Sequence, residues 1–116
     1  MKVILFQIFL KTFYQYIDLY YLKTLELISE EDMRRVFKKV AELGAGIELN
    51  YGALRFPDEE AEIHLRPYRI AKECGCKFYC GSDAHHPDAL YDSGKYFERA
   101  IKLLGLCESD KMDICL

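Results

Sequence analysis

The chain has 116 residues, which is enough for one hydrophobic core and too few for a complete eight-stranded α/β barrel. Apolar residues make up 51% and charged residues 30%, with a formal net charge of -3, which is an ordinary composition for a single soluble domain and excludes a disordered or fibrous chain. The 16 basic residues are scattered along the sequence instead of forming a stripe, so we expect no nucleic-acid partner.

The amino-terminal sequence and the cysteines indicate in which cellular compartment the protein is found. An apolar run at residues 3–10 is too short for a signal peptide and lacks a small-residue cleavage site. No run reaches the roughly 18 to 20 apolar residues of a membrane span. The five cysteines lack the paired C-x-x-C spacing of a zinc knuckle, and we expect them to be reduced and partly buried. These features predict a cytoplasmic protein without a membrane partner.

Residues 1–28 fit two structures. Large apolar side chains recur there at helical spacing, although their aromatic and β-branched content also suits strands. We favour helix for this segment, whose apolar positions are Phe6, Phe9, Leu10, Phe13, Ile17, Tyr20 and Tyr21.

From Ser29 onward the pattern is clearer. Ser29 followed by Asp32 resembles a capping box and predicts the start of a helix that Gly44 ends. Residues 46–50 read as a short buried strand, and residues 51–57 read as a loop.

The second half repeats this alternation. Residues 58–63 suit a helical turn, and Pro67 suits the first position of a helix that runs to Cys74 and stops at Gly75. We interpret Cys74-Gly75-Cys76 as a packed turn and not as a soft-metal site. Residues 77–80 predict a second strand. Pro87 can begin a helical turn. Asp92 can cap a further helix that ends at Gly105 and whose apolar stripe is Phe97, Ala100, Ile101 and Leu104.

The order helix, strand, helix, strand, helix predicts a single α/β domain with parallel strands and crossover helices. Ligands of such sheets bind beyond the carboxyl ends of the strands. Asn50 and Tyr51 follow the first strand, and residues 82–86 follow the second.

Asp83 and His85 are the candidate metal ligands. Side chains two apart in an extended segment point the same way, so the carboxylate and the imidazole can reach one cation. This donor pair suits zinc, manganese or iron, and Ser82 can hydrogen-bond to a ligand. The alternative is a helix cap followed by a surface imidazole. His86 points the other way if the chain is extended, and Asp88 suits the first turn of a helix.

Two segments resemble one family. The sequence GSDAHHP (residues 81–87) after a short strand looks like the last metal-binding motif of the PHP (polymerase and histidinol phosphatase) superfamily, and GIELNYGALR (residues 46–55) is similar to its penultimate strand and loop. The resemblance covers residues 29–106.

The resemblance implies part of a distorted seven-stranded β/α barrel that binds divalent ions and hydrolyses a phosphate monoester such as histidinol phosphate, as in histidine biosynthesis. Asp83 and His85 would bind metal, and Arg55 would bind the substrate phosphate through its guanidinium fork. Glu48, Asn50 and Ser82 would orient these ligands. A metal-bound water would attack phosphorus without a covalent nucleophile on the protein.

The sequence also departs from the family. The amino-terminal His-x-His motif is absent, because His64, His85 and His86 are the three histidines. Tyr16-Ile17-Asp18 is the nearest counterpart of a central His-Pro-Asp motif. We expect His64 to be an exposed side chain, although it could replace a missing ligand.

Catalytic metals generally need about three protein ligands, so we expect the isolated chain to bind metal weakly and to hydrolyse phosphate esters poorly. The alternative is a non-catalytic PHP remnant that assembles with itself or with an amino-terminal barrel half. The aromatic segment at residues 6–21 would then be its docking surface, although we favour ordinary core packing for these side chains.

Overall fold

The computed structural model describes residues 21–81 and 88–113, which form a mixed α/β arrangement that is mostly helical. Its helices are α2 (Tyr21–Leu27), α3 (Glu30–Glu42), α4 (Ala61–Glu73) and α5 (Asp88–Leu104), and its strands are β1 (Gly46–Asn50) and β2 (Lys77–Gly81). Short 3-10 turns occupy the connections: η1 (Gly52–Leu54), η2 (Asp58–Glu60) and η3 (Glu108–Asp110). No helix in these ranges is both long enough and apolar enough to cross a membrane.

Helix α3 begins and ends as its sequence predicts. The Ser29 hydroxyl accepts a hydrogen bond from the backbone N–H of Asp32 at 3.1 Å, which satisfies one of the free donors of the first turn. Gly44 follows the helix with φ +66°, a conformation that glycine adopts without steric cost. Both end signals are therefore confirmed.

The two strands are parallel neighbours, as predicted. Gly46 lies opposite Lys77, and Asn50 lies opposite Gly81. Alternate side chains of β1 face opposite ways, so Ile47 and Leu49 are buried whereas Glu48 and Asn50 are half-buried.

The chain returns to the sheet after α5. Lys111 forms a parallel bridge with Phe78, and the Met112 N–H donates to the Phe78 carbonyl at 2.8 Å. Since Phe78 also pairs with Ile47 of β1, this segment lies along the other edge of β2.

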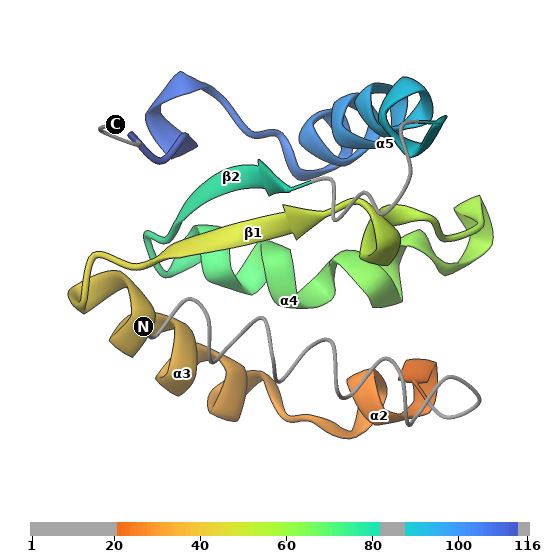
Figure 1. The fold of residues 1–116 in the computed structure, drawn as a ribbon. Helices are drawn as coiled ribbons and strands as arrows, with labels where there is room; N and C mark the ends of the chain where they lie inside the picture. The colour runs from red at the N-terminus through yellow and green to blue at the C-terminus, as the bar shows by residue number, and fades with distance from the viewer. Residues whose placement is uncertain (1–20, 82–87, 114–116) are drawn as a thin grey trace.

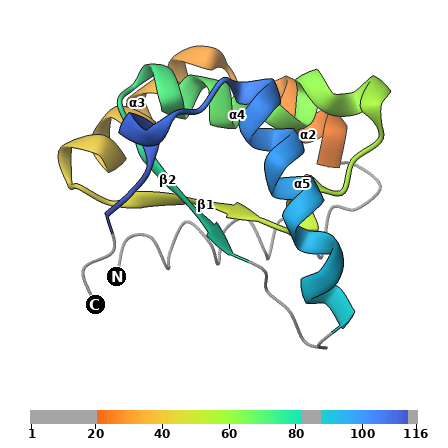
Figure 2. The ribbon, with the colours of Figure 1, turned by 90° about the horizontal axis from the view of Figure 1, so that it is seen from above.

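The elements stack in layers. Figure 1 shows α4 between the two strands and helices α2 and α3, with α5 above the strands in that view. Figure 2 shows α5 passing close to the ends of both strands before the chain turns back. The main core contains buried residues of α3, α4, α5 and both strands, including Phe37, Leu65, Ala100, Ile47 and Phe78.

Helix α4 differs from the prediction, because it begins at Ala61 and contains Pro67 in its interior. Proline has no N–H to donate to the carbonyl four residues earlier, so a mid-helix proline costs stability. Ala61, Leu65 and Tyr68 are nevertheless buried along one side of the continuous helix. Burial of this stripe outweighs the local signal of the proline.

Helix α5 also begins earlier than predicted. It runs without a break from Asp88, so Asp92 lies inside the helix and is not its cap. Its predicted end is confirmed, since Gly105 follows with φ +65°. Ala100 and Leu104 of the predicted apolar stripe are buried, whereas Ile101 is 36% exposed.

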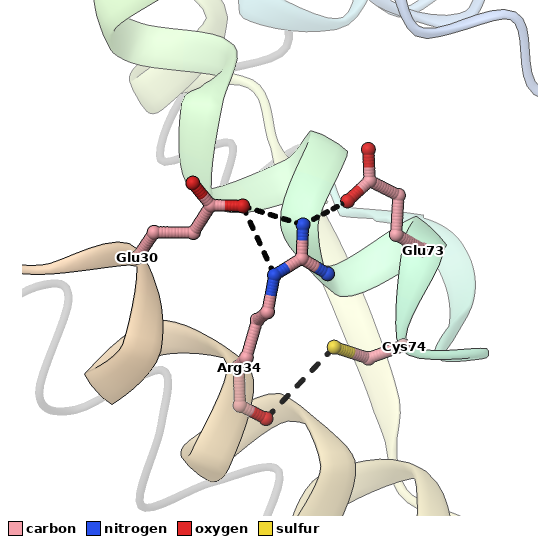
Figure 3. A network of polar contacts seen from close by, with 4 residues as sticks. All are labelled: Glu30, Arg34, Glu73 and Cys74. Atoms are coloured by element: carbon pink, nitrogen blue, oxygen red, sulfur yellow. Dashed lines mark hydrogen bonds and ion pairs between the residues drawn. The ribbon is translucent and has the colours of Figure 1, made fainter.

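Helices α3 and α4 are joined by polar contacts (Figure 3). Arg34 donates to Glu30 within α3 and to Glu73 at the end of α4, and these hydrogen bonds raise the pKa of the guanidinium. The Cys74 thiol lies 3.8 Å from the Arg34 carbonyl oxygen. The contacts fix the end of α4 against α3.

The cysteine turn is packed, as predicted. Gly75 has φ +88°, and the buried Cys76 thiol donates to the Phe37 carbonyl at 3.3 Å. Burial, with a smaller contribution from the neighbouring Cys74, raises the pKa of the Cys76 thiol to about 11. Cys74 and Cys76 are free cysteines.

Candidate functional site

The carboxyl ends of β1 and β2 lie side by side, as the alternating pattern predicts. The Tyr51 N–H donates to the Gly81 carbonyl at 2.9 Å and extends the pairing one residue beyond β1. Ser82, Asp83 and His85 follow Gly81 directly in the sequence but lie outside the described residues, as does His86. The structure therefore describes the β1 half of the predicted site and Gly81, the first residue of its metal motif.

Glu48 lies across the end of β2. A Cβ atom at Gly81 would come within 1.7 Å of the Glu48 Oε1 atom, so this side chain occupies the space beside the glycine. The Asn50 amide nitrogen is 3.5 Å from Glu48 Oε2, and Asn50 Oδ1 accepts a hydrogen bond from the Gly52 N–H at 2.9 Å. The predicted orienting residues Glu48 and Asn50 are thus brought together next to Gly81.

Arg55 is exposed after η1, on the connection that leaves the carboxyl end of β1. Its guanidinium carbon lies 5.5 Å from the centroid of the Tyr51 ring, which is a cation–π distance. No hydrogen bond or ion pair joins the Arg55 side chain to the residues that the structure describes.

The other arginines all have polar partners. Arg34 and Arg35 pair with carboxylates of α3 and α4, and Arg66 donates to the carbonyls of Leu25 and Ile28 at the end of α2. Arg69 and Arg99 each bind one carbonyl and one carboxylate. Arg55 therefore differs from them in having no hydrogen-bonded or ion-paired partner for its guanidinium among the described residues.

Tyr51 links Arg55 to α5. The rings of Tyr51 and Tyr96 meet edge to face, with centroids 5.5 Å apart and planes at 68°. The Lys95 ammonium lies 5.3 Å from the centroid of Tyr96. Neither Lys95 nor Tyr96 was predicted as a site residue, because the expected stripe of α5 began at Phe97. The spacing of four between Tyr96 and the buried Ala100 is the signal that could have placed Tyr96 toward the protein.

The prediction that His64 is exposed is wrong. Its side chain is buried, with 7% of the residue exposed, and its ring stacks on Phe56 at a centroid distance of 5.0 Å. His64 Nε2 lies 3.2 Å from Glu60 Oε2. Position 64 lies on the inward side of α4, and the predicted break at Pro67 hid that periodicity.

Arg99 of α5 also contacts Phe56. Its guanidinium lies over the Phe56 ring at 4.4 Å and donates to the Phe56 carbonyl and to Asp58. The segment that follows Arg55 is therefore held to α5 on one side and to α4 on the other.

A separate groove of about 660 Å³ runs between β2, the end of α5 and η3. Cys80, Ile101, Cys107 and Asp110 are among its lining residues, and burial raises the pKa of the Cys80 thiol. The groove is lined by apolar side chains, by two thiols, by the carboxylates of Glu108, Asp110 and Asp113, and by Lys111.

Metal coordination cannot be built from the described residues alone, which contain no group of three or more suitably placed His, Cys, Asp or Glu side chains. Comparisons with protein-family models, with curated proteins and with solved structures found no match.

Proposed function

We propose that this chain is the carboxyl-terminal part of a PHP-type β/α barrel and carries part of a phosphoesterase site. In this proposal Arg55 binds the phosphate of a small monoester, and Asp83 and His85 bind a divalent ion. Glu48, Asn50 and Ser82 orient these groups. The proposal rests on the sequence resemblance and on the placement of Arg55.

The observation on which the proposal depends is the set of contacts that the Arg55 guanidinium makes. Its guanidinium has no carboxylate or carbonyl partner among the described residues, whereas the other arginines do. It also follows the carboxyl end of β1, where ligands of parallel sheets bind. A planar guanidinium matches two oxygens of a phosphate, which makes an unengaged arginine at this edge suited to a phosphate ester.

The order of the strands is compatible with the barrel. β1, β2 and the Lys111–Met112 segment are parallel neighbours in chain order, with α4 and α5 between them. Barrels place consecutive strands side by side, and so does each half of a doubly wound sheet on one side of its switch point, so this order is compatible with both. A piece cut from a barrel would have this order.

A bound divalent ion would supply an activated water at neutral pH. The described residues do not provide a complete ligand set, and Asp83 with His85 supplies only two donors. We therefore expect weak metal binding and slow hydrolysis by the isolated chain. The role that this chain itself supplies is phosphate binding by Arg55.

Two measurements test this function. Titration with inorganic phosphate, followed by NMR, should shift resonances near Arg55, and Arg55→Gln should abolish the shifts. Arg35→Gln is the matched control, because Arg35 is exposed and its ion pair among the described residues is with Asp32 of its own helix. Equal phosphate binding by both variants would remove Arg55 from the site.

Metal binding is tested by calorimetric titration with Mn²⁺ and Zn²⁺ and by an assay with p-nitrophenyl phosphate. We expect weak binding that Asp83→Ala and His85→Ala reduce further, with little turnover. Rapid turnover that Asp83→Ala eliminates would show that the expected impairment is wrong. Metal binding unaffected by either substitution would remove the metal site.

A second function is assembly, favoured by the pairing of β1 with a strand on one edge only within the described ranges. Edge strands are sites where another chain can add. The aromatic segment 6–21 predicted as the docking surface lies outside the described residues except for Tyr21, the first residue of α2. Light scattering after size exclusion would show a dimer if the chain pairs with itself, and a monomer at all concentrations would contradict self-assembly.

A further inference from the structure

We propose that Arg55, Tyr51, Tyr96 and Lys95 form a cation–tyrosine row that binds a phosphate ester bearing a second anionic group, such as a carboxylate or another phosphate. The inference rests on the proposed function, because Arg55 is the phosphate-binding end of the row. It extends that function by naming the substrate class and by adding Lys95 as the residue that selects it.

The row is continuous across two elements. Arg55 lies 5.5 Å from the Tyr51 centroid, Tyr51 meets Tyr96 at 5.5 Å, and Lys95 lies 5.3 Å from the Tyr96 centroid. The first two residues come from the connection after β1, and the last two come from α5. Contact between the rings therefore holds a cation of each element at the same edge of the sheet.

The charges of the row are not neutralised inside the described part of the protein. Neither Arg55 nor Lys95 forms a hydrogen bond or an ion pair there, and both are exposed. The Glu48 carboxylate lies against Gly81 in the sheet. Two cations that no carboxylate of the described residues pairs with favour a ligand with two negative groups.

An ammonium-bearing ester is the less suited ligand. A substrate ammonium could bind to a tyrosine face, but each tyrosine of the row already has a protein cation at its ring. Such a ligand would bring a third positive charge to the row. The row therefore selects against an amino alcohol phosphate, although the family resemblance alone suggests that class.

Three six-carbon probes separate these classes: 6-phosphogluconate has a second anion, glucose 6-phosphate has none, and glucosamine 6-phosphate has an ammonium. Their affinities are measured by NMR titration at low ionic strength, where exposed charges are least screened. We expect 6-phosphogluconate to bind about threefold more tightly than glucose 6-phosphate, since an exposed ion pair contributes less than a tenfold gain. Glucosamine 6-phosphate should bind most weakly.

The variants assign the preference to Lys95. Lys95→Gln should bring the ratio of the first two affinities close to one, and Lys102→Gln, which removes an exposed lysine of the same helix, should leave the ratio unchanged. Tyr96→Leu should lower the ratio, whereas Tyr96→Phe should keep it.

The results that would contradict the role of the row differ from those that would contradict phosphate binding by Arg55. A ratio that Lys95→Gln does not change, or tightest binding of glucosamine 6-phosphate, would overturn the role of the row while Arg55→Gln still weakened all three probes. Probes that bind equally well to Arg55→Gln would overturn the proposed function. Absence of binding by all three would overturn both.

Discussion

At the scale of single residues, the Glu48 side chain has room in its observed position because residue 81 is a glycine. The sequence placed Glu48 on a strand and Gly81 at the end of the next, and from this order alone the two residues could be assigned to one edge of the sheet. It did not reveal that the Glu48 side chain fills the space beside Gly81. That contact depends on the register, in which Glu48 lies opposite Tyr79 and Asn50 lies opposite Gly81.

Gly81→Ala should destabilise the protein by about 1–2 kcal/mol, because the new methyl group would overlap the Glu48 carboxylate and its adjoining carbons. In a Glu48→Ala background the same change should cost about 1 kcal/mol less, which is the coupling energy of two residues in contact. Urea denaturation of the wild type, the two single variants and the double variant measures this cycle.

Gly94→Ala is the control, since no atom of the described residues outside its own helix backbone lies within 4 Å of the position where its Cβ would be. Gly94 is exposed within α5, so alanine there should stabilise the protein by about 0.5–1 kcal/mol. Equal costs of Gly81→Ala in both backgrounds would show that Glu48 does not occupy the space beside Gly81.

For the other residues of the proposed site, the sequence likewise predicted some positions and missed the contacts between segments. Arg55 could be named from the sequence, but its lack of a carboxylate or carbonyl partner among the described residues emerges only by comparison with the other arginines, which bind such groups. Tyr96 was missed because its contact with Tyr51 crosses from α5 to the β1 connection, and Lys95 was missed because its place in the row depends on Tyr96. Contacts between distant segments leave no local pattern in the sequence.

At the scale of elements, helix ends were predictable where a single residue determines them. Ser29 caps α3 through its own hydroxyl, and Gly44 and Gly105 adopt positive φ after their helices. Interiors were less predictable. Pro67 read as a start because proline is common in the first turn of a helix, whereas the burial of Ala61 and Leu65 determines where α4 begins.

The interior position of Pro67 leads to a second prediction. Pro67→Ala should stabilise the protein by about 1–2 kcal/mol, because alanine supplies the missing N–H and relieves the steric conflict of a mid-helix proline. Part of the gain is offset, since alanine gives the unfolded chain more freedom. The free energy of unfolding from urea titration measures the change.

Pro57 provides the comparison, because it precedes η2 in extended backbone and lies outside α4. Pro57→Ala restores no helical hydrogen bond, and we expect it to be neutral or destabilising by about 0.5 kcal/mol. If Pro67→Ala instead lowers the free energy of unfolding, then α4 requires the proline. That result would be expected for a helix that begins at Pro67.

At the scale of the whole molecule, the alternation of helices and strands correctly predicted a parallel pair with its carboxyl ends together. The return of the chain to β2 was not predicted. Residues 111–113 have the sequence Lys-Met-Asp, which lacks the alternating apolar pattern of a strand. Their pairing comes from backbone groups, with the Met112 N–H bound to the Phe78 carbonyl, and such bonds are independent of side-chain type.

The segment at residues 111–113, which returns to β2, should increase the free energy of unfolding measurably. Met112 also covers Gly46, where an added Cβ would lie 2.0 Å from the methionine sulfur, so one residue contacts both strands. A chain that ends after Asp110 should therefore be less stable than a chain that ends after Asp113, by about 1–3 kcal/mol, through loss of a backbone hydrogen bond and of partly buried apolar area.

Comparing these two shortened chains isolates residues 111–113, because both lack the same last residues. Met112→Ala in the longer of the two should account for the apolar part of the loss, and Lys111→Ala, at an exposed position, should have little effect. Hydrogen exchange at residues 78–80 should become faster when the segment is removed. If the two shortened chains have the same stability and the same exchange at β2, then the outer edge of β2 does not depend on this segment, and the chain-order argument for a barrel loses its third parallel neighbour.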